Sequence, residues 1–409
     1  MQILQRSGFL WAVAAMLLAG STGARAADYA HVSETSVNAT VPLFGALTLT
    51  DTVVQDGANP INRFTMHRLR KTSGSVRGVI LLLPSLGNNF RSYLFSDNGD
   101  MTTSFAATFA WLGYEVWGYS SRETGILTGA CGGALDCSPA LHWSMQTIVD
   151  DVGYIRSRIA ATTPGESVVV GGLSLGALSA LAVVNQSPGA YNGLLAWEGS
   201  LVTDDAAIRA HNLPYCSQFS NLVAAGIAVD DQSLPFVKTV AELARTAPNA
   251  PFAIPVPGFP PGLTNRQAFV LILSTPNPVA PSPRPGFITA VGNVGTGSLQ
   301  YSSSARLTAN IALFNDVTSN RVGRDFYCSL AGVETAYSNN LKAFTAPVMI
   351  VKAGQGFGSI MDELPGKLGS TSVRSIGVEA YAHVDHLGSP LHWFALELPI
   401  LHWLEQAVN

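Results

Sequence analysis

The feature that most constrains the fold is a regular alternation of strand-like and helix-like segments from residue 63 to residue 199. Strand-like runs stand at 63–71, 76–86, 114–120, 167–173 and 191–199, and segments with helical spacing stand at 101–113, 144–161 and 175–186. The run at 76–86 is almost continuously apolar, which is typical of a strand buried on both faces of a parallel sheet. Serial alternation of this kind implies right-handed crossovers. It therefore predicts an α/β fold with a doubly wound, mostly parallel sheet and helices on both faces.

The alternation stops after residue 199 and resumes with an apolar strand at 346–354, before a closing helix at 390–408. Between them, proline-rich stretches at 247–262 and 274–286 exclude long regular elements. A disordered linker is the alternative, but the many interleaved apolar side chains and two cysteines favour an ordered insertion. We therefore expect a core made of 27–199 and 345–409, and an insertion at 200–344 that covers one end of the sheet.

The N-terminus has the pattern of a secretory signal peptide. Arg6 precedes a short apolar run, and small residues end in Ala24-Arg25-Ala26, an A-x-A cleavage site, so residues 1–26 are interpreted as the signal. A membrane anchor is the alternative, but the run is too short to span a bilayer comfortably. Only 12% of the residues are charged, which is common in exported proteins and leaves too few Lys and Arg for a nucleic-acid-binding face. No other segment resembles a membrane span, and we expect a secreted or periplasmic protein.

Export would place the four cysteines in a compartment where disulfides form. In an oxidising compartment an even number favours disulfides, and the simplest pairing is Cys131–Cys137 with Cys216–Cys328. Four cysteines allow three connectivities. A zinc site is the alternative, but the spacings match no common zinc pattern, and no metal site is expected.

The most specific motif is Gly172-Leu173-Ser174-Leu175-Gly176, a G-x-S-x-G sequence between a buried strand and a helix. On such a turn the serine hydroxyl stands above the sheet edge, and the next backbone N–H lies at a helix N-terminus, aimed at a developing oxyanion. A packed strand-to-helix corner is the structural alternative. The context makes Ser174 the candidate nucleophile.

A nucleophilic serine needs a base, and His383 and His386 follow a late strand that returns to the carboxyl edge of the sheet. Two solvent-facing loop histidines are the alternative interpretation. His383 is the preferred base because it comes first after the strand.

From about residue 63 to its end, apart from the insertion, the chain resembles α/β-hydrolases of the lipase and esterase type. The order of Ser174 and His383 is similar to the Ser…acid…His order of that superfamily, and 381–388 resembles the H-x-D stretch of acid lipases. By this resemblance the insertion is a cap or lid, and the backbone N–H groups of Leu86 and Leu175 form the oxyanion hole. Pro84 and Ser85 depart from the usual His-Gly of the oxyanion loop.

Two carboxylates are candidates for the third member of a triad. Most of the superfamily has an Asp shortly after the strand at 346–354, where this chain has Gln355 and Gly356, and Asp362 follows eight residues after Gly354. Glu198, at the end of the strand at 191–199, is the place that a pancreatic-lipase-like branch uses. Because a carboxylate at the end of so apolar a strand is costly without a partner, Glu198 is preferred to Asp362.

The sequence thus predicts a secreted serine hydrolase that cleaves carboxylic esters with a hydrophobic part through an acyl-enzyme, its partner a small-molecule or lipid-like ester. An amidase or peptidase would use the same triad. A non-catalytic binding protein on this fold is the alternative of another class. No cofactor motif is present, so no cofactor is expected.

Overall fold

The computed structural model describes residues 28–408, apart from 42–44, 95–103, 132, 134 and 282–285. The expected signal peptide, residues 1–26, lies outside the described residues. In the part of the chain that is described, no helix is long and apolar enough to cross a membrane.

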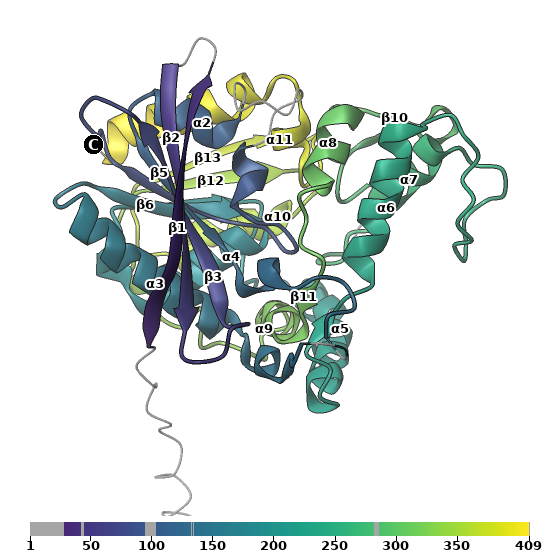
Figure 1. The fold of residues 1–409 in the computed structure, drawn as a ribbon, viewed down its shortest axis with the longest axis horizontal. Coiled ribbons are helices and arrows are strands. Elements are labelled where there is room, and N and C mark those ends of the chain that lie inside the picture. The colour runs from purple at the N-terminus through teal and green to yellow at the C-terminus, as the bar shows by residue number, and fades with distance from the viewer. Residues whose placement is uncertain are drawn as a thin grey trace, which may run out of the picture.

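The centre of the described structure is a nine-stranded sheet in the order β1-β2-β3-β5-β4-β6-β7-β12-β13 (Figure 1). The strands β4, β5, β6, β7, β12 and β13 run parallel to one another, whereas β1, β2 and β3 form an antiparallel extension that pairs with β5 at one edge. The predicted α/β class with a mostly parallel sheet is confirmed. The strand bounds are Tyr29–Val41 (β1), Gly45–Asp56 (β2), Arg63–Lys71 (β3), Val79–Leu83 (β4), Glu115–Ser120 (β5), Val168–Leu173 (β6), Gly193–Trp197 (β7), Val348–Ala353 (β12) and Val373–Val378 (β13).

Helices cover both faces of the sheet because alternate residues of its central strands enter two different cores. In β4, Leu81 and Leu83 belong to one core, and Ile80 and Leu82 belong to the other. The first core is packed under α3, α4 and α10, and the second under α2 and the C-terminal helix. The bounds are Phe105–Trp111 (α2), Met145–Thr162 (α3), Leu175–Gln186 (α4), Ser359–Lys367 (α10), and Trp393–Glu397, Leu398–Trp403 (α12) and Leu404–Val408 for the C-terminal helix.

The longer regular elements between β7 and β12 are helices. In Figure 1, α6, α7 and α8 lie together to one side of the sheet, whereas α5 and α9 lie side by side closer to α3. The bounds are Ala206–Ala224 (α5), Ser233–Thr246 (α6), Asn265–Leu273 (α7), Ser304–Ile311 (α8) and Asn320–Leu330 (α9), with short strands Val229–Asp230 (β8), Val291–Asn293 (β9), Ser298–Leu299 (β10) and Thr318–Ser319 (β11). A separate apolar cluster holds α6, α7 and α8 together.

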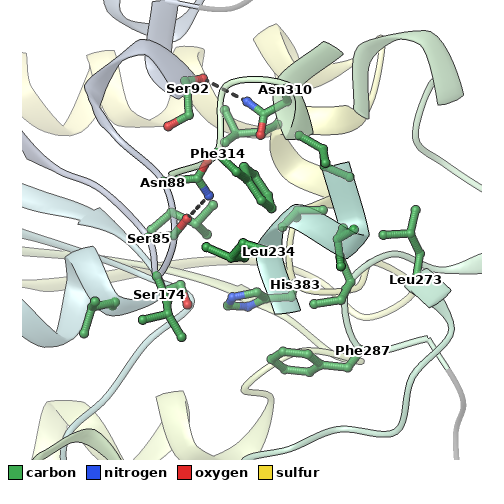
Figure 2. A pocket seen from close by; sticks show the side chains of 18 of the residues that line it. Ser85, Asn88, Ser92, Ser174, Leu234, Leu273, Phe287, Asn310, Phe314 and His383 are labelled. Atoms are coloured by element: carbon green, nitrogen blue, oxygen red, sulfur yellow. Dashed lines mark hydrogen bonds between the residues drawn. The ribbon is translucent and has the colours of Figure 1, made fainter. Parts of the chain in front are cut away.

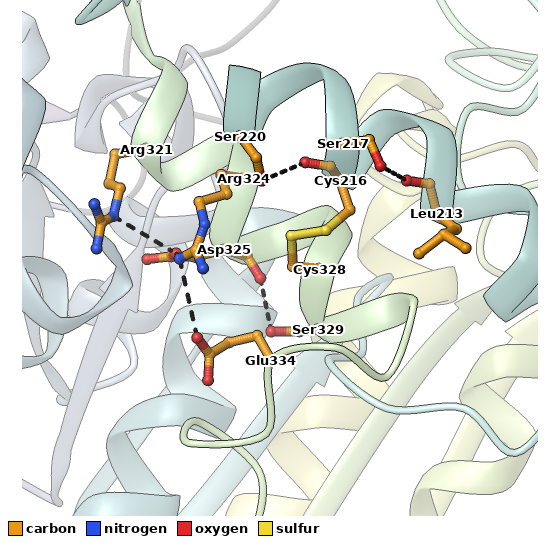
Figure 3. The surroundings of a disulfide bond; sticks show 10 residues. All are labelled: Leu213, Cys216, Ser217, Ser220, Arg321, Arg324, Asp325, Cys328, Ser329 and Glu334. Carbon is orange, nitrogen blue, oxygen red and sulfur yellow. Dashed lines mark hydrogen bonds and ion pairs between the residues drawn. A yellow bond between two sulfur atoms is a disulfide. The ribbon is translucent and has the colours of Figure 1, made fainter. Parts of the chain in front are cut away.

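Both favoured disulfides are present. Cys216 of α5 faces Cys328 of α9, and the bond joins two positions 112 residues apart (Figure 3). One turn before Cys328, Asp325 accepts the Met145 N–H at 3.0 Å, which ties α9 to the start of α3. The second disulfide, Cys131–Cys137, closes a small loop. The long-range disulfide therefore joins α5 to α9, which is itself hydrogen-bonded to α3.

Candidate active site

The backbone around Ser174 forms a strained turn. β6 ends at Leu173, α4 begins at the next residue after the serine, and Ser174 has φ 59° and ψ −122°. A Cβ at Gly172 or at Gly176 would collide with the carbonyl oxygen of Leu83. The two glycines of the motif are therefore required by close approach of β4, and the turn presents a half-buried hydroxyl above the sheet.

His383 follows β13 and is held in a fixed orientation. Its backbone N–H donates to the carbonyl of Phe287 at 2.9 Å. Its ring stacks on the Phe287 ring, with centroids 4.6 Å apart and planes 18° from parallel. Phe357 packs on the ring as well, at 5.6 Å. Figure 2 shows the Ser174 hydroxyl pointing toward this imidazole.

Glu198 supplies the carboxylate that contacts His383. Its side chain is 0% exposed, and its Oε2 lies 3.1 Å from Nδ1 of His383. Oε1 accepts the Ala353 N–H at 2.5 Å, and Oε2 also accepts the Phe357 N–H at 3.0 Å. A Cβ at Gly356 would collide with Oε2. The missing side chain at Gly356 thus leaves room for the Glu198 carboxylate, which follows β7.

The second candidate acid, Asp362, lies elsewhere. Its side chain is 59% exposed on α10, and its carboxylate pairs with Nζ of Lys352 at 2.5 Å. The structure brings Ser174, His383 and Glu198 together and leaves Asp362 at the surface.

The neighbours of His383 in the 381–388 stretch have other surroundings. Asp385 is fully buried and supports the local backbone. His386 is also fully buried, and burial together with the charge of His383 lowers its pKa to about 4. The donors to Asp385 are the N–H groups of Ala290 and Ala382 and the hydroxyls of Thr289 and Ser302.

The residues expected to supply oxyanion N–H groups, Leu86 and Leu175, line the same cavity as Ser174 and His383. The loop after β4 that carries Leu86 is fastened to the segment between α8 and β11. The Nδ2 of Asn89 donates to the Leu313 carbonyl at 2.7 Å. The backbone N–H of Asn315 donates to the Gly87 carbonyl at 2.7 Å, and its Nδ2 donates to the Asn88 carbonyl at 3.2 Å.

Tyr93 joins the two strand ends that flank the site. It belongs to a 3-10 turn, Phe90–Leu94 (η1), which follows the loop that carries Leu86. Its buried hydroxyl donates to the Leu83 carbonyl and accepts the Leu173 N–H, both at 2.8 Å. Burial raises the pKa of this phenol, so it stays protonated and keeps both bonds. Nothing in the sequence pattern singles out Tyr93, because its role depends on which strands are neighbours.

A cavity of about 380 Å³ opens above Ser174. In Figure 2, Asn88 and Ser92 lie above Ser174, and Leu273 and Phe287 lie on the far side of His383 from the serine. Helices α6, α7, α8 and α9 each contribute apolar side chains to the wall: Leu234, Val237, Ile272, Leu273, Leu307, Ile311, Val322 and Phe326. Among the described residues, no group of three or more His, Cys, Asp or Glu side chains forms a metal cluster.

Comparison with known proteins gives structural neighbours only. No protein-family model and no curated protein sequence matches the chain. A structure described as a candidate lipase from Sulfolobus solfataricus aligns with 91% of this chain and 99% of its own, at 17% identity and a TM-score of 0.62. A monoacylglycerol lipase from Paleococcus ferrophilus aligns over 83% and 98% at 14% identity and a TM-score of 0.46. The likeness to the Sulfolobus structure is one of fold.

Proposed function

We propose that this chain, which has the α/β-hydrolase fold, is an exported serine hydrolase that cleaves carboxylic esters with a hydrophobic part. The observation that carries the proposal is the contact of 3.1 Å between the buried Glu198 carboxylate and Nδ1 of His383. A carboxylate in that position fixes the tautomer in which Nδ1 carries the proton and Nε2 accepts one. The Ser174 hydroxyl faces the same ring (Figure 2).

The proposed reaction is acyl transfer in two steps. Ser174 Oγ attacks the ester carbonyl while Nε2 of His383 takes its proton, and the N–H groups of Leu86 and Leu175 stabilise the oxyanion. His383 then gives the proton to the departing alcohol, which leaves an acyl-enzyme. A water that loses its proton to His383 hydrolyses that ester and restores the serine. The Glu198 carboxylate stabilises the imidazolium.

The walls of the cavity support the choice of substrate. Residues 200–344 are proposed to be a cap over the carboxyl edge of the sheet, and this segment as a whole contributes most of the apolar residues that line the cavity. Binding to an apolar wall is favourable because it removes the apolar acyl chain or alcohol of a substrate from water. A small-molecule or lipid-like ester with an aliphatic part therefore fits this cavity better than a charged peptide.

Two disulfides support export, because disulfides persist in oxidising compartments such as the periplasm or the extracellular space.

The test is to treat the purified protein with a fluorophosphonate probe, map the labelled residue by mass spectrometry, and assay p-nitrophenyl esters of increasing chain length against peptide p-nitroanilides. We expect labelling at Ser174, ester turnover that rises with chain length, and at least a thousandfold loss in Ser174→Ala. Ser179→Ala is the matched control, because Ser179 is a buried serine of the same helix that contacts Met145.

Absence of labelling at Ser174, with a folded protein, would instead favour a non-catalytic binding protein. Faster cleavage of the anilides than of the esters would favour an amidase or peptidase.

A further inference from the structure

A second serine–histidine–aspartate series lies outside the cavity. Ser120 at the end of β5, His67 in β3 and Asp51 in β2 sit on three neighbouring antiparallel strands, and Asp51 and His67 are direct cross-strand partners. Ser120 Oγ lies 2.7 Å from Nε2 of His67, and Nδ1 of His67 lies 2.7 Å from Oδ1 of Asp51. The arrangement has the residue types of a catalytic triad, so its role has to be decided from its surroundings.

The surroundings of Ser120 do not fit a second nucleophile. Its side chain is 2% exposed, and neither Ser120 nor His67 lines the cavity above Ser174. The hydroxyl accepts the backbone N–H of Phe90 at 3.1 Å, and it donates to Nε2 of His67, which in turn donates through Nδ1 to Asp51. Each group therefore donates to the next one from Phe90 to Asp51. The first donor of the series is a backbone N–H of η1.

The other end of the series returns to the same turn. The guanidinium of Arg91, the next residue of η1, donates to Oδ2 of Asp51 at 2.8 Å. The His67 ring stacks on the Phe90 ring, with centroids 4.9 Å apart and planes 19° from parallel. A Cβ at Gly118 would overlap the Phe90 ring, so this turn lies directly on β5. Two successive residues of η1 are thus held at both ends of one hydrogen-bonded series.

Because η1 follows the oxyanion loop, the series acts on the site. Leu86 precedes η1 by four residues, and Tyr93 of η1 bonds the ends of β4 and β6 beside Ser174. Movement of η1 would shift the backbone of Leu86 relative to the serine.

We infer that Asp51, His67 and Ser120 are positioning residues that hold η1, and through it the oxyanion loop, in the geometry that stabilises the tetrahedral intermediate. The inference rests on the proposed function. Ser120 takes no part in the chemical steps. The Asp51, His67 and Ser120 series instead orients backbone N–H groups of the oxyanion loop.

The test combines steady-state kinetics with binding of phenylboronic acid, which forms a tetrahedral adduct with a reactive serine. In Ser120→Ala we expect kcat to fall about 10–100-fold with little change in KM, and the affinity for phenylboronic acid to fall by a similar factor. Ser120→Thr keeps the hydroxyl and should recover most of both losses. Asp51→Asn, a milder change at the far end of the series, should show a smaller loss of the same kind.

Ser329→Ala is the matched control, since Ser329 is a similarly buried serine whose hydroxyl donates to the carbonyl of Asp325. It should lower stability without changing kcat or boronate affinity. Wild-type kcat and boronate affinity in folded Ser120→Ala or Asp51→Asn would overturn the inference while ester hydrolysis and Ser174 labelling stand. Absence of fluorophosphonate labelling in the wild-type protein would overturn the proposed function and this inference together.

Discussion

At the scale of single residues, the site concentrates backbone strain at two adjacent strand ends. Ser174 and Glu198, at φ 59° and 51°, are the non-glycine residues with positive φ in the part of the chain described. Each such conformation costs on the order of 1–3 kcal/mol and persists only where its surroundings enforce it. Here Ser174 N–H bonds the Trp197 carbonyl at 2.9 Å, and Glu198 N–H bonds the Val351 carbonyl at 2.8 Å. The two turns are thus locked to the next strand of the sheet.

The choice of acid leads to a direct prediction. In Glu198→Gln we expect kcat to fall about 10²–10⁴-fold, because the amide loses the charge that stabilises the imidazolium. Its NH₂ group would also face at least one backbone N–H donor at either oxygen position. Asp362→Asn should stay within about twofold of wild type, because its side chain is exposed and bonded to Lys352. Initial rates on one p-nitrophenyl ester decide the matter, and a larger loss in Asp362→Asn would reverse the assignment.

His386 provides a prediction about acid stability. Its folded pKa is lowered from 6.5 to about 4, chiefly by burial, so the unfolded chain binds this proton more tightly than the folded chain does. The associated stability is complete above about pH 6.5 and is lost as the pH falls toward 4, by about 3 kcal/mol.

The measurement is the free energy of unfolding in urea at pH 7 and pH 4.5. His386→Met should show a smaller acid loss than wild type, whereas His402→Gln, at an exposed position, should show the wild-type loss. Equal losses in all three proteins would contradict the prediction.

At the scale of helices and strands, the two disulfides close loops of very different length. Chain-entropy arguments assign about 5 kcal/mol to Cys216–Cys328, which spans 112 residues, and about 2 kcal/mol to Cys131–Cys137, which spans 6. We expect replacement of the first pair by alanines to lower the free energy of unfolding more than replacement of the second. Urea unfolding of the two double variants checks the order, and a reversed order would contradict it.

The sequence pattern predicts most of the parallel strands and helices of the core because they are buried on both faces or on one stripe. It does not reveal β1, whose residues 31–38 are all exposed. A strand without a buried face has no periodic apolar signal, so the hairpin of β1 and β2 shows only in three dimensions.

Some residues of the candidate site can be predicted from the sequence, and others can be identified only in the folded structure. Ser174 and His383 stand out because a local motif and a position after a strand suffice to suggest them. Glu198 and Asp362 remain alternatives from the sequence, since the decision depends on whether β12 leaves room beside β7. That room comes from Gly356, and only the folded arrangement connects a missing side chain at 356 with a carboxylate at 198. Asp51, His67 and Ser120 are even less visible, because their three strands are adjacent only in the sheet.

At the scale of the whole molecule, the segment between β7 and β12 separates Glu198 from His383 along the chain but not in space. The parallel pairing of β7 with β12 keeps the ends of the two strands in register. The oxyanion loop is bonded to the same segment through Asn89 and Asn315. The apolar wall, the oxyanion loop and the candidate triad therefore form one connected structure.

The course of the long disulfide has a consequence for the integrity of the chain. The proline-rich loop at 251–262 has exposed residues and lies between Cys216 and Cys328 in sequence. A single proteolytic cut in this loop yields a two-chain protein, with Ser174 and Glu198 on one chain and His383 on the other. The Cys216–Cys328 bond still links the two chains covalently, and β7 still pairs with β12. In an environment rich in proteases, such a nicked form keeps every proposed catalytic residue attached to a single covalent assembly.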